Sequence, residues 1–384
     1  MNLLPGREEA WSWVASSESL RMPALQIHFP PHAPYHLNLP PRHVAGEAHA
    51  TSRGAPLTET MLAMQTLKQG DVRLTEVPIP SPTDGQALVK MELASICGSD
   101  LHIVDYGWLV EEYPLRPGYP GHEGIGTVID ANGTELSNGD RVLVTPAIWD
   151  SLSFAECQAL GTNFLTALPP DSDQKPDHLL MAQQLGTVIF AAKRLPNLLG
   201  QTCVVMGQGS AGLFWNYVLK HLGAARVIAI EPIAHRLEVG AGFGSDDRIS
   251  DTFDAATRAV LELTGEGADV VVEAIGTKET HGQALDLVRP DGQIVWFGVP
   301  QSAELIPFDF DTFFRKRIAA YSPLGAQDEL GLSSFRQALK WINDGQIDMS
   351  EIVTHSFPLS RVDEAFKAAR ERANGAVKIV VTMG

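Results

Sequence analysis

Cysteine and histidine occur in this sequence at positions that could hold a metal ion. The segment Cys97-Gly-Ser-Asp-Leu-His102 is followed, 20 residues after its histidine, by Gly121-His-Glu-Gly124. A thiolate and an imidazole are ligands that zinc prefers, and a catalytic zinc site needs three protein ligands with one position left open for water or substrate. On spacing alone, however, a buried structural cysteine accounts for Cys97 equally well.

A glycine-rich turn later in the chain could bind a dinucleotide. Gly207-Gln-Gly-Ser-Ala-Gly212 follows an apolar run that ends at Met206 and precedes a stretch compatible with a helix as far as Leu222. In such a turn the first glycine allows a tight bend, the second lets the backbone approach a pyrophosphate, and the third allows the helix to pack on the strand. The motif alone is weak, but here its expected context is present.

An acidic residue supports the dinucleotide interpretation and favours NAD over NADP. Glu231 ends a second apolar run, 24 residues after Gly207, where a carboxylate can accept hydrogen bonds from both ribose hydroxyls. The same carboxylate would repel a 2′-phosphate, and no arginine follows it directly. Arg236, five residues later, could flank the adenosine ribose, or it could be an ordinary surface arginine.

The patterning along the chain predicts two kinds of structure around these motifs. From about residue 64 to 168, short alternating segments such as 87–93 and 126–129 predict a β-rich region. From about 186 to 321, apolar strands alternate with helical stretches, which predicts a parallel, doubly wound sheet. The strands expected there are 203–206, 227–230, 270–272 and 294–297. Beyond them we expect an amphipathic helix over 335–342 and a closing strand over 377–381.

Residues 1–60 differ from the rest, with paired prolines and no sustained helical or strand period. We expect either an extension with little fixed structure or a start codon placed too early, with Met61 or Met64 as the true beginning. A strand-like pattern starts at Met64.

Composition excludes several classes of function. The chain has 384 residues, more than one hydrophobic core usually takes, and a formal net charge of −17, which would repel a nucleic-acid phosphate backbone. Three cysteines are too few for a disulfide framework, and no apolar run is long enough to cross a membrane. We therefore expect a cytoplasmic protein that binds neither nucleic acid nor membrane.

Taken together and in this order, the motifs resemble those of the zinc-dependent medium-chain dehydrogenases, which include alcohol, sorbitol, threonine and glucose dehydrogenases. The resemblance rests on Cys-Gly-Ser-Asp-x-His, Gly-His-Glu-Gly, Gly139-Asp-Arg-Val142 and the glycine turn, and it runs from about residue 64 to the C-terminus. It implies an α/β protein in which a GroES-like catalytic domain (61–185) is followed by a Rossmann NAD-binding domain (186–322). A C-terminal segment (323–384) would complete the catalytic domain.

The resemblance also implies roles for individual residues. Cys97 and His122 would be zinc ligands, Glu123 would approach the metal transiently or stand behind its ligands, and Asp100 would orient the histidine. Ser99 and His102 would pass the alcohol proton to solvent by way of the cofactor ribose. This pairing is chemically reasonable, because a short hydroxyl can relay a proton and a histidine near its ordinary pKa can release it.

Two features depart from the commonest family pattern. Where relatives carry Glu-Pro-Leu or a cysteine, this chain has Gln183-Gln-Leu-Gly-Thr187, which would place Gln183 at the metal and Thr187 beside the nicotinamide. The chain also lacks the four-cysteine lobe that holds a structural zinc in many relatives, so Cys157 and Cys203 are expected in the core. Gly98 replaces the arginine that touches the pyrophosphate in some alcohol dehydrogenases.

These features predict a zinc-dependent oxidoreductase that interconverts a secondary alcohol or polyol and its carbonyl with NAD(H). One catalytic zinc would lower the pKa of the alcohol, and no structural zinc would be bound. Two alternatives remain open: a zinc-free quinone or enoyl-type reductase of the same fold, and a non-enzymatic dinucleotide-binding protein. The resemblance further implies a homodimer or homotetramer, paired through the strand near 294–297 and the segment after it.

Overall fold

The computed structural model describes residues 59–372 and 374–384, all of which belong to one compact unit spanning residues 56–384. The hypothesis that residues 1–60 are an extension or an early start lies almost entirely outside the described residues. The first strand, β1 (Thr60–Lys68), begins four residues earlier than the pattern at Met64 suggested. Among the described residues, no helix is long and apolar enough to cross a membrane.

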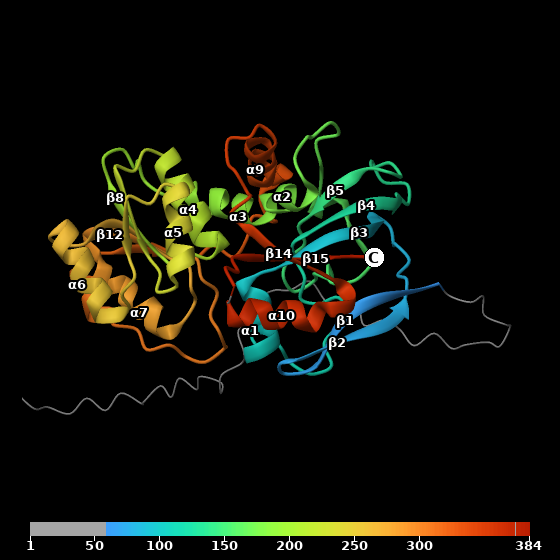
Figure 1. The fold of residues 1–384 in the computed structure, drawn as a ribbon, viewed down its shortest axis with the longest axis horizontal. Helices are drawn as coiled ribbons and strands as arrows, with labels where there is room; N and C mark the ends of the chain where they lie inside the picture. The colour runs from blue at the N-terminus through green and yellow to red at the C-terminus, as the bar shows by residue number, and fades with distance from the viewer. Residues whose placement is uncertain (1–58, 373) are drawn as a thin grey trace, which may run out of the picture. The chain divides into compact units, whose positions relative to one another are not determined.

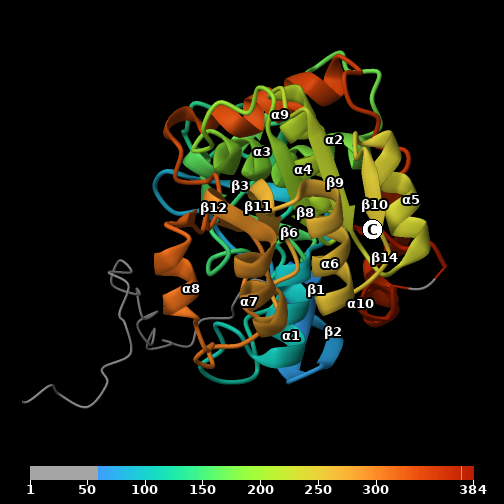
Figure 2. The ribbon, with the colours of Figure 1, turned by 90° about the vertical axis from the view of Figure 1, so that its left-hand side faces the viewer.

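One half of the unit is built on a six-stranded, wholly parallel sheet, as the alternating pattern predicted. Its strands are β8 (Thr202–Met206), β9 (Arg226–Ile230), β10 (Asp247–Ile249), β11 (Ala268–Glu273), β12 (Val288–Trp296) and β13 (Ala319–Tyr321). The strand order β10-β9-β8-β11-β12-β13 reverses direction between β8 and β11. Ligands of doubly wound sheets bind where the order reverses, at the carboxyl ends of the strands. The doubly wound prediction is therefore confirmed (Figure 2).

Helices alternate with these strands along the chain, as in other doubly wound folds. They are α4 (Ser210–His221), α5 (Ala234–Gly242), α6 (Phe253–Thr264), α7 (Lys278–Leu287) and α8 (Phe310–Arg315). The helix predicted to end at Leu222 is α4, which ends one residue earlier. Strand β12 is longer than the predicted 294–297 run, because it continues back through Pro290-Asp-Gly292 after a register shift in its pairing with β11. Turn-forming residues inside a strand concealed this extension.

The other half is a mostly antiparallel β structure. It comprises the hairpin of β1 with β2 (Asp71–Pro78) and a seven-stranded sheet made of β3 (Gln86–Ile96), β4 (Gly124–Asp130), β5 (Arg141–Val144), β6 (Cys157–Gly161), β7 (Leu165–Ala167), β14 (Val353–Pro358) and β15 (Lys378–Thr382). Strand β15 pairs antiparallel with β3, so the C-terminal segment completes the sheet that the N-terminal strands begin (Figure 1). This topology is the one that the resemblance implied.

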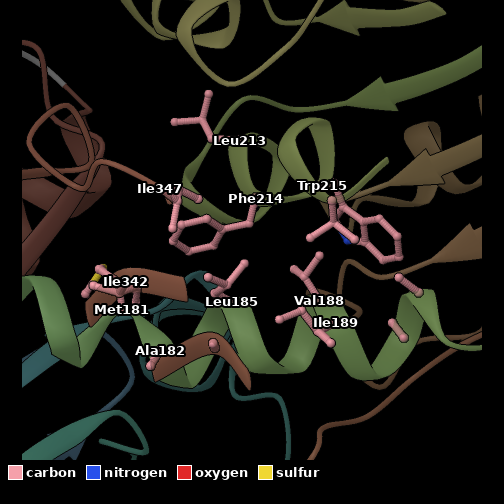
Figure 3. Packing of buried hydrophobic residues seen from close by; sticks show 14 of the residues in the cluster. Met181, Ala182, Leu185, Val188, Ile189, Leu213, Phe214, Trp215, Ile342 and Ile347 are labelled. Carbon is pink, nitrogen blue, oxygen red and sulfur yellow. The ribbon is translucent and has the colours of Figure 1, made fainter. Parts of the chain in front are cut away.

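The remaining helices are α1 (Gly98–Tyr106), α2 (Pro176–Leu180), α3 (Ala182–Ala192), α9 (Ser333–Asn343) and α10 (Val362–Glu371), with short 3-10 turns η1 (Thr162–Phe164), η2 (Leu330–Leu332) and η3 (Leu359–Arg361). Helix α3 is apolar on most of its surface and packs against α4 and α9, with Leu185 and Val188 facing Phe214 and Trp215 (Figure 3). Gly186 lets α9 approach closely, since a Cβ there would lie 2.4 Å from Phe335 Cδ1. The boundary predicted at residues 185/186 stays a prediction, and α3 spans it.

Candidate functional site

Three side chains with metal-binding atoms meet where α1 begins and β4 is about to start. Cys97 caps the N-terminus of α1, and His122 and Glu123 directly precede β4. The Cys97 sulfur, a ring nitrogen of His122 and a carboxylate oxygen of Glu123 all lie within 4.8 Å of one another. Cys97 is half-buried and lines a cleft, so the alternative that it is a plain core cysteine is wrong. By contrast, Cys157 and Cys203 are buried among apolar residues, as expected.

Asp100 holds the candidate ligands in position. It is fully buried, its Oδ1 lies 3.0 Å from His122 Nδ1, and its Oδ2 accepts a hydrogen bond from the Cys97 amide at 2.8 Å. Burial opposes protonation of His122, yet the Asp100 carboxylate and the Cys97 sulfur raise its pKa well above the ordinary value. The same negative charges that attract a proton would attract a cation. With Nδ1 engaged by Asp100, Nε2 of His122 is the nitrogen left for a metal.

Glu123 forms a buried ion pair that the sequence did not reveal. Its Oε2 lies 2.6 Å from Lys378 Nζ on β15 and also accepts a hydrogen bond from Ser95, while its Oε1 is buried without a hydrogen-bond partner in the described residues. Burial would raise the pKa of Glu123, but Lys378 and His122 lower it below the ordinary value. The one sequence signal for Lys378 was a charge inside the otherwise apolar closing strand 377–381.

Two glutamines, rather than one, stand beside the candidate ligands on the first turn of α3. Gln183 and Gln184 both line the cleft. It is Gln184 whose Nε2 lies 3.7 Å from Cys97 Sγ, and its Oε1 is buried with no hydrogen-bond partner among the described residues. Because amide nitrogen and oxygen are assigned by inference, an exchange of the two atoms would turn the oxygen toward the sulfur. Gln184 is therefore a second candidate for the third ligand, and the assignment of Gln183 remains a prediction.

The two predicted proton-relay residues both line this cleft. Ser99 Oγ lies 3.4 Å from His122 Nε2, beside the position that a metal would occupy. His102 packs against Gly276, whose added Cβ would lie 3.1 Å from His102 Cε1. The expectation that His102 keeps its ordinary pKa is wrong, because burial lowers the pKa despite backbone contacts with Val299 and Pro300 that raise it. His102 is therefore neutral at pH 7 and free to accept a proton.

The glycine turn has the geometry that a dinucleotide site requires. Gly207 follows β8 with φ of +88°, a conformation that glycine adopts without strain. A Cβ on Gly212 would lie 1.8 Å from the Gly207 carbonyl oxygen, so only glycine fits where α4 starts. Glu231, at the end of β9, accepts hydrogen bonds from the amides of Gln208 at 2.8 Å and Ile233 at 3.1 Å. These bonds fix the carboxylate at the edge of the cleft.

A single cleft connects the two groups of residues. All the predicted site residues except Gly212 line it, including Thr187, whose hydroxyl donates to the Gln183 carbonyl at 3.2 Å. Arg236 also lines the cleft and is only 9% exposed, so the alternative of an ordinary surface arginine is wrong. Its Nε and Nη2 donate to the Ala376 carbonyl at 3.0 and 2.7 Å, a contact between distant parts of the chain that no local pattern could indicate.

Comparison with protein families supports both halves of the chain. Residues 83–168 match the family described as alcohol dehydrogenase GroES-like domain, and residues 211–344 match the family described as zinc-binding dehydrogenase. The first match contains Cys97, Ser99, His102, His122 and Glu123, whereas the second contains Gly212, Glu231 and Arg236. The two matches occur in the order that the motifs predicted.

Whole-chain relatives extend the similarity beyond these two regions. Sorbitol dehydrogenase of Gallus gallus is 28% identical over 83% of this chain and 96% of its own length, and L-threonine 3-dehydrogenase of Bacillus velezensis is 25% identical over 80% and 94%. The solved structure of an alcohol dehydrogenase from Thermus sp. ATN1 superimposes with a TM-score of 0.73 at 26% identity, covering 84% of this chain and 99% of that one. The chain therefore belongs to the zinc-type medium-chain dehydrogenases, a family of oxidoreductases.

Proposed function

We propose that this protein oxidises a secondary alcohol or polyol to its carbonyl, or runs the reverse reaction, with NAD as the hydride carrier and one zinc at Cys97 and His122. The single observation that carries the proposal is the cleft that joins the Cys97–His122–Glu123 group to the Gly207 turn and Glu231. Alcohol, carbonyl, NAD⁺ and NADH balance with release of one proton. The names of the sorbitol, alcohol and threonine dehydrogenase relatives support this class of substrate.

The residues present fit a zinc ion. A thiolate, an imidazole held by a buried aspartate, and a free buried amide oxygen on Gln184 form a set of donors suited to zinc, and Glu123 Oε1 stands without a partner nearby. Zinc bound there would supply Lewis acidity to a substrate oxygen, and NAD would supply the hydride acceptor. A zinc-free reductase of the same fold is not favoured, because such an enzyme would have no use for this group.

The protein's own groups would then handle the proton and the orientation of the reactants. Ser99, beside His122, would accept the proton of the substrate hydroxyl and pass it by way of the nicotinamide ribose toward His102. His102 is neutral because burial lowers its pKa, so it can take the proton up and release it to solvent. Thr187 would lie beside the nicotinamide, and Glu231 would hold the adenosine ribose and disfavour NADP.

An exposed apolar segment after β12 supports pairing with a second copy of the chain. Leu305, Phe310 and Phe314 are 99%, 63% and 70% exposed. Burial of such side chains against an identical surface would remove a large apolar area from water, which stabilises association. The absence of a structural zinc and the boundaries of the two domains are likewise part of this proposal.

The proposed function predicts one zinc per chain and NAD-linked turnover. Metal content should be measured on protein purified without chelator, and reduction of NAD and of NADP followed across a panel of secondary alcohols and polyols. We expect about one zinc per chain and activity with NAD well above that with NADP. Protein that holds no zinc and reduces neither cofactor with any alcohol would contradict the proposal.

The choice between Gln183 and Gln184 as third ligand has its own test. Removal of a neutral amide ligand should weaken zinc binding by roughly 10- to 100-fold, on the scale of changes around metal sites. We expect zinc dissociation constants, measured by chelator competition, to rise in whichever of Gln183→Ala and Gln184→Ala removes the ligand, the other variant serving as the matched control. Unchanged affinity in both variants would mean that neither glutamine binds the metal.

A further inference from the structure

The cleft contains arginines whose charges are not all neutralised by the protein. Arg236, Arg370 and Arg372 line it. Arg370 forms a bidentate ion pair with Asp105, with nitrogen–oxygen distances of 2.7 to 2.9 Å. Arg236 donates only to a carbonyl oxygen. Arg372 is exposed, and over residues 59–372 and 374–384 its side chain has neither a hydrogen bond nor an ion pair. Two cations therefore face the cleft without a carboxylate partner in direct contact.

The position of Arg372 is defined by the two groups that feel its charge. Burial is the main cause of the lowered pKa of His102 and of Arg236, and the charge of Arg372 contributes to the lowering in both. Coulomb interactions weaken with distance and with screening by water. Arg372 is therefore close to the relay histidine at one end of the cleft and to Arg236, near Glu231, at the other.

Arg236 directs a further donor toward the glycine turn. A Cβ built on Gly209 would lie 3.8 Å from Arg236 Nη1, the guanidinium nitrogen that takes no part in the bonds to Ala376. Gly209 is the residue at which the backbone can approach a phosphate most closely, directly before the N-terminus of α4. The donor, the glycine and the helix end thus converge on one region of the cleft.

We propose that Arg372, together with Arg236, binds the diphosphate of the dinucleotide from the side opposite the glycine turn. The inference rests on the proposed function, in which Glu231 holds the adenosine ribose and His102 is reached through the nicotinamide ribose. The diphosphate joins these two riboses, so it must lie between the ends of the cleft that Arg372 spans. Gly98 brings no cation to this region, and Lys378 is engaged by Glu123.

A diphosphate would also relieve the repulsion between the two arginines. Both carry a positive charge, and each arginine–phosphate contact is a charge-assisted, often bidentate, hydrogen bond. Arg236 lies on α5 of the parallel-sheet half, whereas Arg372 follows α10 in the segment that leads into β15. Bound diphosphate would therefore link the two halves of the unit through opposite charges, which deepens the proposed function by assigning a cofactor contact to the C-terminal segment.

The test compares ligands with and without a diphosphate on the full-length protein. Dissociation constants should be measured for NADH by fluorescence, and for adenosine diphosphate ribose and adenosine by competition with NADH. In Arg372→Gln we expect NADH and adenosine diphosphate ribose to bind about tenfold more weakly, the scale of one lost charge-assisted hydrogen bond, while adenosine is unchanged. Arg372→Lys should retain part of the affinity, and Arg258→Gln, an exposed arginine on α6, is the control.

Each outcome decides the matter. If Arg372→Gln binds NADH as tightly as the unsubstituted protein does, or if adenosine is weakened as much as NADH, the diphosphate assignment is overturned while the proposed function stands. If the unsubstituted protein binds neither NADH nor adenosine diphosphate ribose, the proposed function fails and this inference fails with it. Affinity that falls more steeply with salt for the unsubstituted protein than for Arg372→Gln would give independent support.

Discussion

Replacement of Cys97 by serine is expected to remove the metal and nearly all turnover. A serine hydroxyl does not ionise near neutral pH, so the site would lose its anionic ligand and the Lewis acidity that a zinc ion provides. That acidity is worth several kcal/mol of transition-state stabilisation, so we expect kcat/KM to fall on the order of 1000-fold or more. Metal analysis and steady-state kinetics with the best substrate of the alcohol panel check this directly.

The matched control for this variant is Cys157→Ser. Cys157 is buried in a separate apolar cluster with Met61 and Ala155, outside the cleft. Its replacement should leave zinc content and kcat/KM near those of the unsubstituted protein. NADH binding should survive in Cys97→Ser, because the Gly207 turn belongs to the parallel sheet. Full zinc content and turnover in Cys97→Ser would remove the basis of the zinc site.

Replacement of Lys378 by methionine is expected to destabilise the protein strongly. Lys378 is 2% exposed and lies 2.6 Å from Glu123, and burial lowers the lysine pKa less than the Glu123 charge raises it, so both groups are charged in the folded state. Loss of one partner leaves an unpaired buried charge, which costs about 3–5 kcal/mol. Chemical denaturation at pH 7 should show a fall of this size in the free energy of unfolding.

Two further variants separate the ion pair from general effects on the strand. Lys90→Met makes the same change at an exposed position of β3, in the same sheet, and should alter stability by less than about 1 kcal/mol. The double variant Glu123→Gln/Lys378→Met removes both charges and should recover much of the stability lost in Lys378→Met. A single Lys378→Met variant as stable as Lys90→Met would show that the pair contributes little.

The family motifs that the sequence carried are local, which is why they could be identified without a structure. Cys97 and Asp100 lie within one turn at the start of α1, and Gly207 to Gly212 form one strand–turn–helix junction, so spacing along the chain already states their geometry. Buried parallel strands were also predictable, because both faces of such strands are apolar. The doubly wound half follows from these runs and the helices between them.

Contacts between distant segments were decided only by the tertiary structure. Lys378 reaches Glu123 because β15 pairs with β3, and Arg236 reaches Ala376 across 140 residues. Which glutamine faces Cys97 depends on the rotation of α3, and that rotation is fixed by packing of Gly186 on Phe335 rather than by any local pattern. The pKa of His102 likewise depends on residues of the other half that bury it. The sequence by itself determined the types of chemical group and the order of the folding units, because those follow from short-range spacing and periodicity. Their pairing, burial and charge balance arise when remote segments pack together, and only the folded chain brings those segments into contact.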